Sequence, residues 1–218
     1  MKNIIQILLI IFVFSSCANE TKKSTTKAAE TTKTTTKVAK KDVSKIDYPL
    51  DSLLSFDSEE ALKKVYGKHV KRSVGYYPEG MGEYKMTLLF PDSKNQVEFV
   101  WEDDSLHFNK LQYVRIYSKE TDWKTKENIT IGTDMKTLEL INKKPFSFFG
   151  LEWDYSGAID WKDGHLTERN IYGNLSYPGE QMPVEFMALI GDHSIESTSE
   201  IAQKANLILR EIIMKPSN

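Results

Sequence analysis

The residue types that could do chemistry gather between Trp153 and Asp163. Asp154 and Asp160 lie in this segment, and two carboxylates are enough to cleave a glycosidic bond when one acts as an acid and the other as a nucleophile or base. A hydrolase that uses Asp154 or Asp160 is therefore one hypothesis. Solvent-exposed acids on an acidic protein would give the same pattern, so hydrolysis stays the alternative to a binding function and no catalytic residue is assigned.

Aromatic residues alternate with these acids. Trp153, Tyr155 and Trp161 are separated by even numbers of residues, and such side chains share one face of a strand. We therefore predict a strand over 153–161. An amphipathic strand normally buries its apolar side, so we expect the aromatic face to belong to the core. The open alternative is a ligand-binding surface made of Trp153, Asp154, Tyr155, Asp160 and Trp161.

The histidines and the cysteine do not suggest a metal centre or a nucleophile. The four histidines, at positions 69, 107, 165 and 193, include no pair four residues apart, which is the spacing of a helical zinc motif. Cys17 is the only cysteine in the chain, which excludes an internal disulfide and a zinc site built from several thiolates. The sequence therefore predicts neither a metal nor a cofactor.

The N-terminus has the organisation of a secretory signal peptide. Lys2 gives a short positive region, and residues 4–14 form an apolar segment that is too short for a bilayer, which needs about 20 residues. Phe14-Ser15-Ser16-Cys17 follows and resembles the lipobox of bacterial lipoproteins. The resemblance implies that residues 1–16 are removed and that lipid on Cys17 makes a membrane the first partner. Ala18, rather than Asp, follows the cysteine, which in lipoproteins favours the outer membrane.

Charge separates a tether from the domain that it carries. Residues 18–46 contain eight lysines against three acids and no aromatic residue, so residues 17–46 are predicted to be a lipidated, disordered Thr/Lys-rich tether. Residues 47–218 hold every tryptophan and tyrosine and carry a net charge of −8, out of −2 for the whole chain. Nucleic acid is not expected as a partner, because phosphate contacts need clustered Lys and Arg.

Residues 47–218 are predicted to form a single globular α+β domain. Asp57 lies three residues before Glu60, which is typical of a capping box, and predicts a helix that ends at Gly67. Strands over 84–90 and 96–101 flank a turn-rich loop of hairpin length. A third strand is predicted over 110–117.

The same order then starts again. Setting Thr133 opposite Asp57 aligns a second short helix with the first, and strands over 153–161 and 166–172 follow. The turn between them is Lys162-Asp163-Gly164, because Asp-Gly is a strong hairpin pattern. We predict a mainly antiparallel sheet with two short helices, arranged as two helix-hairpin repeats.

The last segment is predicted to be a helix. Ser197 and Glu200 form a capping-box pattern, an apolar stripe with helical spacing continues to Ile213, and Pro216 ends it. This C-terminal helix is expected to pack on the sheet.

A family resemblance rests on the second half of the domain. Its motifs are Ile131-Gly132-Thr133, Leu138–Asn142, Pro145–Phe148 with Gly150, Trp153-Asp154-Tyr155 with Gly157, and Trp161. They look like a group of uncharacterised envelope lipoproteins of Bacteroidota. The order of helix and strands is similar to the helix-plus-sheet modules of the β-lactamase-inhibitor and outer-membrane-assembly lipoprotein type. The resemblance implies a membrane-anchored envelope lipoprotein. The leading hypothesis for its function is a non-enzymatic domain that binds an envelope protein, glycan or peptide.

Overall fold

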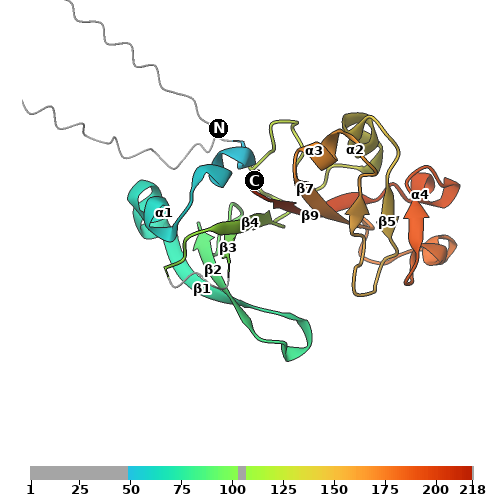
Figure 1. The fold of residues 1–218 in the computed structure, drawn as a ribbon. Coiled ribbons are helices and arrows are strands. Elements are labelled where there is room, and N and C mark those ends of the chain that lie inside the picture. The colour runs from blue at the N-terminus through green and yellow to red at the C-terminus, as the bar shows by residue number, and fades with distance from the viewer. Residues whose placement is uncertain (1–48, 103–106, 218) are drawn as a thin grey trace, which may run out of the picture. The chain divides into compact units, whose positions relative to one another are not determined.

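A six-stranded antiparallel sheet lies at the centre of the structure, a computed structural model that describes residues 49–102 and 107–217. Its strand order is β1-β2-β3-β4-β9-β7, and a second sheet has the order β6-β5-β8 (Figure 1). An antiparallel bridge between Ala158 and Asn174 joins the two sheets. The strands are β1 Val70–Tyr76, β2 Glu83–Leu89, β3 Val97–Trp101, β4 Leu111–Ile116, β5 Ser147–Phe149, β6 Ile159–Asp160, β7 Ile171–Ser176, β8 Ser194–Glu196 and β9 Ile208–Met214.

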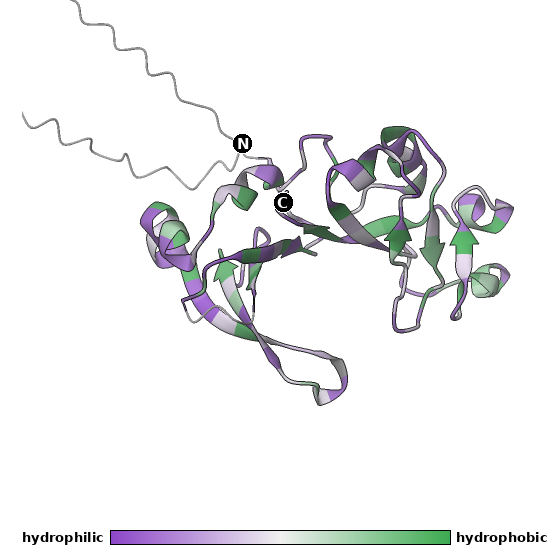
Figure 2. Cartoon of the chain, in the orientation of Figure 1, coloured by the Kyte–Doolittle hydropathy of each residue, from purple (hydrophilic) through white to green (hydrophobic). Residues whose placement is uncertain are grey.

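Short helices cover one face of the six-stranded sheet (Figure 1). In Figure 2, hydrophobic residues concentrate along the strands, whereas α1 is largely hydrophilic. Leu62 of α1 and Leu138 of α2 are buried in one apolar core with Trp101 and Ile212. The α-helices are α1 Glu59–Tyr66, α2 Met135–Asn142, α3 His165–Glu168 and α4 Glu200–Ala205, and the 3-10 helices are η1 Leu50–Ser55, η2 Gly67–His69, η3 Pro78–Gly80 and η4 Val184–Leu189.

The α+β class with a mainly antiparallel sheet is confirmed. Strands β2, β3 and β4 lie close to the three strands predicted in the first half, and β2 and β3 form the predicted hairpin. All five residues of β3 are buried, so this central strand is covered on both faces. The predicted signal peptide (1–16) and the tether with Cys17 (17–46) lie outside the described residues.

Helices α1 and α2 are equivalent elements. They have the same length and are offset by 76 residues, which is the offset that aligned Thr133 with Asp57 in the sequence. Each begins after a residue whose side chain, Ser58 or Asp134, accepts a hydrogen bond from the N–H of the third helical residue. The cap of α1 is thus Ser58, one residue later than predicted. Each helix ends at a residue with positive φ, Gly67 or Lys143.

The strands that follow repeat the same pattern. The first unit, residues 57–116, has the strand order β1-β2-β3-β4, and the second unit, residues 133–214, has the order β5-β6-β7-β9. An insertion that contains η4, β8 and α4 separates β7 from β9. In both units the start of the helix hydrogen-bonds to the chain at the start of the fourth strand. The equivalent backbone pairs are Glu59–Phe108 with Met135–Leu207, and Asp57–Lys110 with Thr133–Leu209.

The two units meet where their fourth strands pair. Strands β4 and β9 are antiparallel, and Arg115 lies opposite Ile213 at the centre of the pairing. The flanking pairs, Val114–Met214 and Ile116–Ile212, exchange places under a two-fold rotation about that centre. The domain therefore consists of two similar units related by a pseudo-two-fold axis at Arg115–Ile213.

The long C-terminal helix predicted from the sequence is wrong. Helix α4 ends at Ala205, where Asn206 takes a left-handed conformation with φ of 45°. Residues 208–214 form strand β9, which lies between β4 and β7 inside the six-stranded sheet. The isoleucines of this segment are β-branched and favour a strand. The predicted capping box is also wrong, because Ser199 precedes α4 and Ser197 is buried elsewhere.

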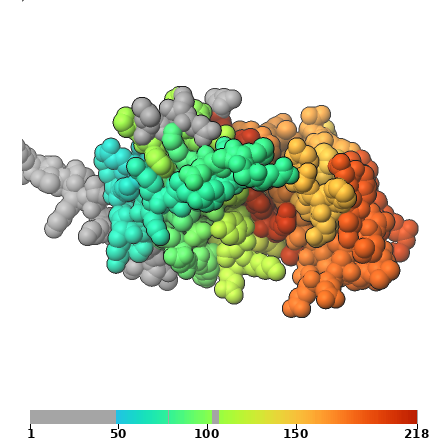
Figure 3. Space-filling model, turned by 90° about the horizontal axis from the view of Figure 1, so that it is seen from below, coloured from blue at the N-terminus to red at the C-terminus, as the bar shows by residue number. Residues whose placement is uncertain are grey.

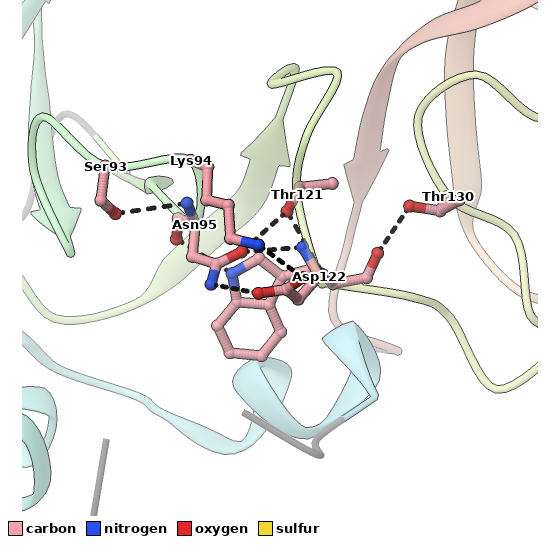
Figure 4. Close-up of polar contacts among 7 residues, drawn as sticks. Ser93, Lys94, Asn95, Thr121, Asp122 and Thr130 are labelled. Atoms are coloured by element: carbon pink, nitrogen blue, oxygen red, sulfur yellow. Dashed lines mark hydrogen bonds and ion pairs between the residues drawn. The ribbon is translucent and has the colours of Figure 1, made fainter. Parts of the chain in front are cut away.

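The β2–β3 turn is fixed to the connection between the two units (Figure 4). Asn95 Nδ2 donates to Asp122 Oδ2 at 2.9 Å, and the Asp122 N–H donates back to Asn95 Oδ1 at 2.8 Å. The indole N–H of the buried Trp123 donates to the Asn95 carbonyl at 3.0 Å. Hydrogen bonds from Asn95 and Lys94 lower the pKa of the Asp122 carboxyl. These bonds hold the start of the inter-unit connection against the first sheet hairpin.

Candidate functional site

Trp153 and Tyr155 lie on an exposed loop rather than on a strand. The strand predicted over 153–161 is reduced to Ile159 and Asp160, and the preceding residues form turns. Trp153 is 58 % exposed and Tyr155 is 67 % exposed, so the prediction that both belong to the core is wrong. The chain reverses here because Glu152 and Gly157 both adopt positive φ, which a continuous strand does not allow.

Trp161 is the one member of the aromatic series that lies in the core, as predicted. It is 5 % exposed, and its indole N–H donates to the Ile171 carbonyl at 2.6 Å. Its ring meets that of Phe146 edge-on at 5.0 Å. The turn after it has two left-handed residues, Lys162 and Asp163, whereas Gly164 has φ of −78°, so the Asp-Gly hairpin turn predicted from the sequence is wrong. The turn leads into helix α3, and strand β7 starts later than expected.

Phe149 completes an exposed aromatic surface, which we define as Phe149, Trp153 and Tyr155. The Phe149 and Tyr155 rings lie 5.6 Å apart. Phe149 is 41 % exposed at the end of β5, and the other two residues come from the loop that follows. Rings of this kind offer a large apolar area together with a polar group at one end, as on many binding surfaces.

Hydrogen bonds to the neighbouring strands hold this loop in place. The Ser156 carbonyl accepts from Asn174 Nδ2 at 2.9 Å and from Arg210 at 3.3 Å. Gly157 donates to the Phe149 carbonyl, and its own carbonyl accepts from Leu175. A Cβ at Gly157 would lie 2.0 Å from the Leu175 carbonyl oxygen, so only glycine fits this close approach. The aromatic surface is therefore presented by an anchored loop.

Asp154 and Asp160 do not form a paired site. Both are exposed, and Asp160 accepts a hydrogen bond from the Lys162 N–H in its own turn. Neither lines the depression of about 530 Å³ near α2 or the one of about 520 Å³ near β7, both of which the described residues form. Among residues 49–102 and 107–217, no group of three His, Asp or Glu side chains could hold a metal ion.

A second candidate surface is the face of the six-stranded sheet opposite the helices. Arg115 of β4 donates to Glu98 of β3 at 2.6 Å and to the Tyr84 hydroxyl at 3.0 Å, and it lies 3.9 Å from Glu211. Burial opposes the charge on Arg115, but Glu98 outweighs it and raises the Arg115 pKa. Burial also raises the pKa of Glu211, and it raises that of Tyr113 to about 12.

Figure 3 looks onto the molecule from this side. Dark-red residues near the C-terminus, where β9 lies, form the base of a hollow between the β1–β2 hairpin and the yellow-orange residues near position 150. The hollow and the anchored aromatic loop are thus neighbours on one side of the molecule. Sequence reasoning missed the Glu98–Arg115 pair, because the two residues meet only through the register of β3 and β4.

Comparisons of the chain with protein-family models, with curated proteins and with solved structures each gave no match.

Proposed function

We propose that this protein is a lipoprotein of the bacterial outer membrane, anchored by lipid on Cys17, with an extramembrane domain that binds an envelope partner. The lipobox-like Phe14-Ser15-Ser16-Cys17, which contains the only cysteine of the chain, carries the anchoring part of the proposal. One acyl chain holds a protein weakly and several hold it stably, so a multiply acylated cysteine is a sufficient tether. No helix among the described residues has the length and apolar character needed to cross a bilayer.

The anchor is tested by labelling cells with palmitate and separating their membranes. Wild-type protein is expected to incorporate the label and to sediment with the outer membrane. Cys17→Ala is expected to lose the label and leave the membrane fraction, whereas Ser24→Ala in the tether is the matched control and should change neither. Retention of label by Cys17→Ala would refute the lipid anchor.

The exposed aromatic surface carries the binding part. Trp and Tyr dominate the binding energy of many interfaces because each buries a large area at a small cost in side-chain entropy. Phe149, Trp153 and Tyr155 stand on a loop that hydrogen bonds hold in place, and the carboxylates of Glu152 and Asp154 are exposed beside them. This combination favours a partner with flat apolar faces and hydroxyl groups, and we propose an envelope glycan. The hydrolase alternative lacks comparable support, because Asp154 and Asp160 are exposed and line neither the depression near α2 nor the one near β7.

Tryptophan fluorescence tests this assignment directly. Trp101, Trp123 and Trp161 are buried, so Trp153 is the tryptophan whose emission should respond to a ligand at the surface. Soluble peptidoglycan fragments are expected to shift the emission of the wild type and not that of Trp153→Phe. Tyr155→Ala should weaken binding about tenfold, which corresponds to about 1.4 kcal/mol. Tyr172→Ala removes a ring that is 42 % exposed elsewhere on the surface and serves as the control. Equal binding by Tyr155→Ala and wild type would refute the site.

A further inference from the structure

The outer edge of strand β1 and the outer edge of strand β5 are equivalent positions of the two units. At the offset of 76 residues that relates α1 to α2, Val70, Arg72 and Val74 correspond to Phe146, Phe148 and Gly150. Both strands are the first of their unit, and both pair with the second strand on their inner side. What lies outside the two edges differs.

In the second unit, a segment of the chain itself covers this edge. Strand β8 pairs antiparallel with β5, with Ile195 opposite Phe148. The Ser197 N–H donates to the Phe146 carbonyl at 2.8 Å, and the Gly150 N–H donates to the His193 carbonyl at 2.8 Å. The outward-facing backbone groups of β5 are therefore those of residues 146, 148 and 150, and residues 193–197 satisfy them.

The same groups face outward in the first unit. The Phe90 N–H donates to the His69 carbonyl, and the Tyr77 N–H donates to the Gly82 carbonyl. Because hydrogen-bonded and non-hydrogen-bonded pairs alternate along an antiparallel pair, Lys71, Ser73 and Gly75 bond to β2, whereas Arg72, Val74 and Tyr76 direct their N–H and C=O groups away from it.

No strand of the described residues pairs with this side of β1. The two units differ here because their connections differ in length. The insertion that supplies β8 occupies residues 177–207, whereas the equivalent connection from β3 to β4 spans only residues 102–110. Val74 is 42 % exposed on this edge, and Val65 of α1 is 47 % exposed although its equivalent, Ile141, packs against the core.

Strand β1 also lacks the usual protection of an edge. Edge strands are commonly short, bulged, interrupted by proline or charged along their length. β1 has seven residues in continuous register with β2 and contains no proline. Its charges, Lys71 and Arg72, lie in its first half, and Ser73–Tyr76 carry none. The hairpin projects beyond the rest of the sheet in Figure 1, which leaves this half accessible.

We propose that the outer edge of β1 binds an extended segment of a partner protein, which adds to the sheet as an antiparallel strand in the way that β8 adds to β5. The equivalence also gives the chemistry of the segment. In the partner segment, an apolar residue takes the place of Ile195. It lies opposite Arg72 and packs on the face of β1 that carries the Val74 side chain. The acid that corresponds to Glu196 lies opposite Lys71, since Glu196 faces Ser147 in the second unit. Main-chain hydrogen bonds provide the affinity and these two side chains the selectivity.

The test uses the full-length protein and the peptide Asp-His-Ser-Ile-Glu-Ser-Thr, which has the sequence of residues 192–198. Amide hydrogen exchange is measured with increasing peptide. Exchange at Arg72 and Val74, the equivalents of Phe148 and Gly150, is expected to slow by a factor of about ten at a peptide concentration about ten times its Kd, with a Kd of about 1 mM. Absence of protection on β1 at that concentration would overturn the proposal.

Changes to the peptide separate strand addition from other contacts without altering the protein. Methylation of the isoleucine nitrogen removes a donor to the edge and should abolish protection, and replacing its glutamate with lysine should weaken binding several-fold. Val74→Pro removes an outward N–H that the β1–β2 ladder does not use, so it should block binding in a folded protein, whereas Val74→Thr should bind normally. Equal binding of the methylated peptide overturns the proposal. Protection of β1 that depends on protein concentration, without peptide, would assign the edge to a second copy instead.

Discussion

Replacing Trp161 with alanine should destabilise the domain strongly. The side chain is 5 % exposed, packs edge-on against Phe146 and donates a hydrogen bond to the Ile171 carbonyl. Removal of a buried tryptophan costs about 3–5 kcal/mol in lost transfer free energy and cavity formation. For a domain of this size, about 2–4 °C of melting temperature is lost per kcal/mol, so the Tm should fall by about 6–20 °C.

Trp153 provides the matched comparison, because it is the same residue type on the exposed loop. With 58 % of its surface already in water, Trp153→Ala should change the free energy of unfolding by less than about 1 kcal/mol. Trp161→Phe should fall between the two, since it keeps most of the ring volume and loses the hydrogen bond to Ile171, worth about 1 kcal/mol.

Urea denaturation and thermal melts of the three variants provide the measurement. If Trp161→Ala unfolds at the same urea concentration as wild type, the assignment of Trp161 to the core is refuted. If Trp153→Ala is as destabilised as Trp161→Ala, the loop is structural and its aromatic surface is not free to bind a ligand.

Four further outcomes are expected. Gly157→Ala should destabilise the domain by about 2–5 kcal/mol, measured by urea denaturation, because its Cβ meets a backbone oxygen and its φ is 70°. Arg115→Ile leaves Glu98 buried without its partner and should cost about 3 kcal/mol. The double variant Glu98→Tyr/Arg115→Ile, which copies the equivalent pair Tyr172–Ile213, should recover part of that loss. If the losses of the two single variants simply add in the double variant, this expectation is contradicted. Burial raises the pKa of Glu211, so folding favours the protonated form of this side chain. The stability that protonated Glu211 contributes is present below its pKa in the unfolded chain and is lost as pH rises through its pKa in the folded protein. Glu211→Gln should therefore flatten that part of the stability–pH curve. Limited trypsin digestion should cut among residues 22–45 first, and early cuts inside 84–172 would contradict the predicted domain boundary.

The elements that the sequence predicted well are those with local causes. The predicted starts of α1 and α2 lie close to the observed ones, because the capping side chain, Ser58 or Asp134, hydrogen-bonds within the first turn of its helix. The β2–β3 hairpin was found because its strands alternate and its loop is rich in turn residues. β1 was missed, since Lys71, Arg72 and Ser73 interrupt any apolar alternation along an edge strand.

The wrong prediction for the C-terminal segment has a physical reason. Its apolar spacing fits both a helix and a strand, and strand pairing in the folded protein determines which of the two forms. Ile201, Ala205, Ile208 and Ile212 fit a helix by spacing, but Leu209 and Ile212 are buried as parts of a strand between β4 and β7. The chain can change from helix to strand because Asn206 tolerates a left-handed conformation. The local pattern of residues 201–213 does not indicate that part of this segment pairs with β4 on one side and β7 on the other.

The aromatic series failed for a related reason. Alternation of Trp153, Tyr155 and Trp161 predicted a single strand, whereas Glu152 and Gly157 turn the chain and separate the first two rings from the third. Positive φ at a glutamate has no sequence signature, and the loop that contains Glu152 is held by hydrogen bonds from Asn174 and Arg210, which are distant in the sequence. The exposed and the buried aromatic residues are therefore distinguishable only in three dimensions.

The repeat explains why the two candidate surfaces belong to different units. The second unit has an insertion that covers its own edge through β8, and it also carries the aromatic loop. The first unit has a short β3–β4 connection, and it has the Glu98–Arg115 pair at the positions where the second unit has Tyr172 and Ile213. Since the pseudo-two-fold axis relates these positions, the differences between them mark where each unit departed from the shared packing, and the bare edge of β1 is one of those places.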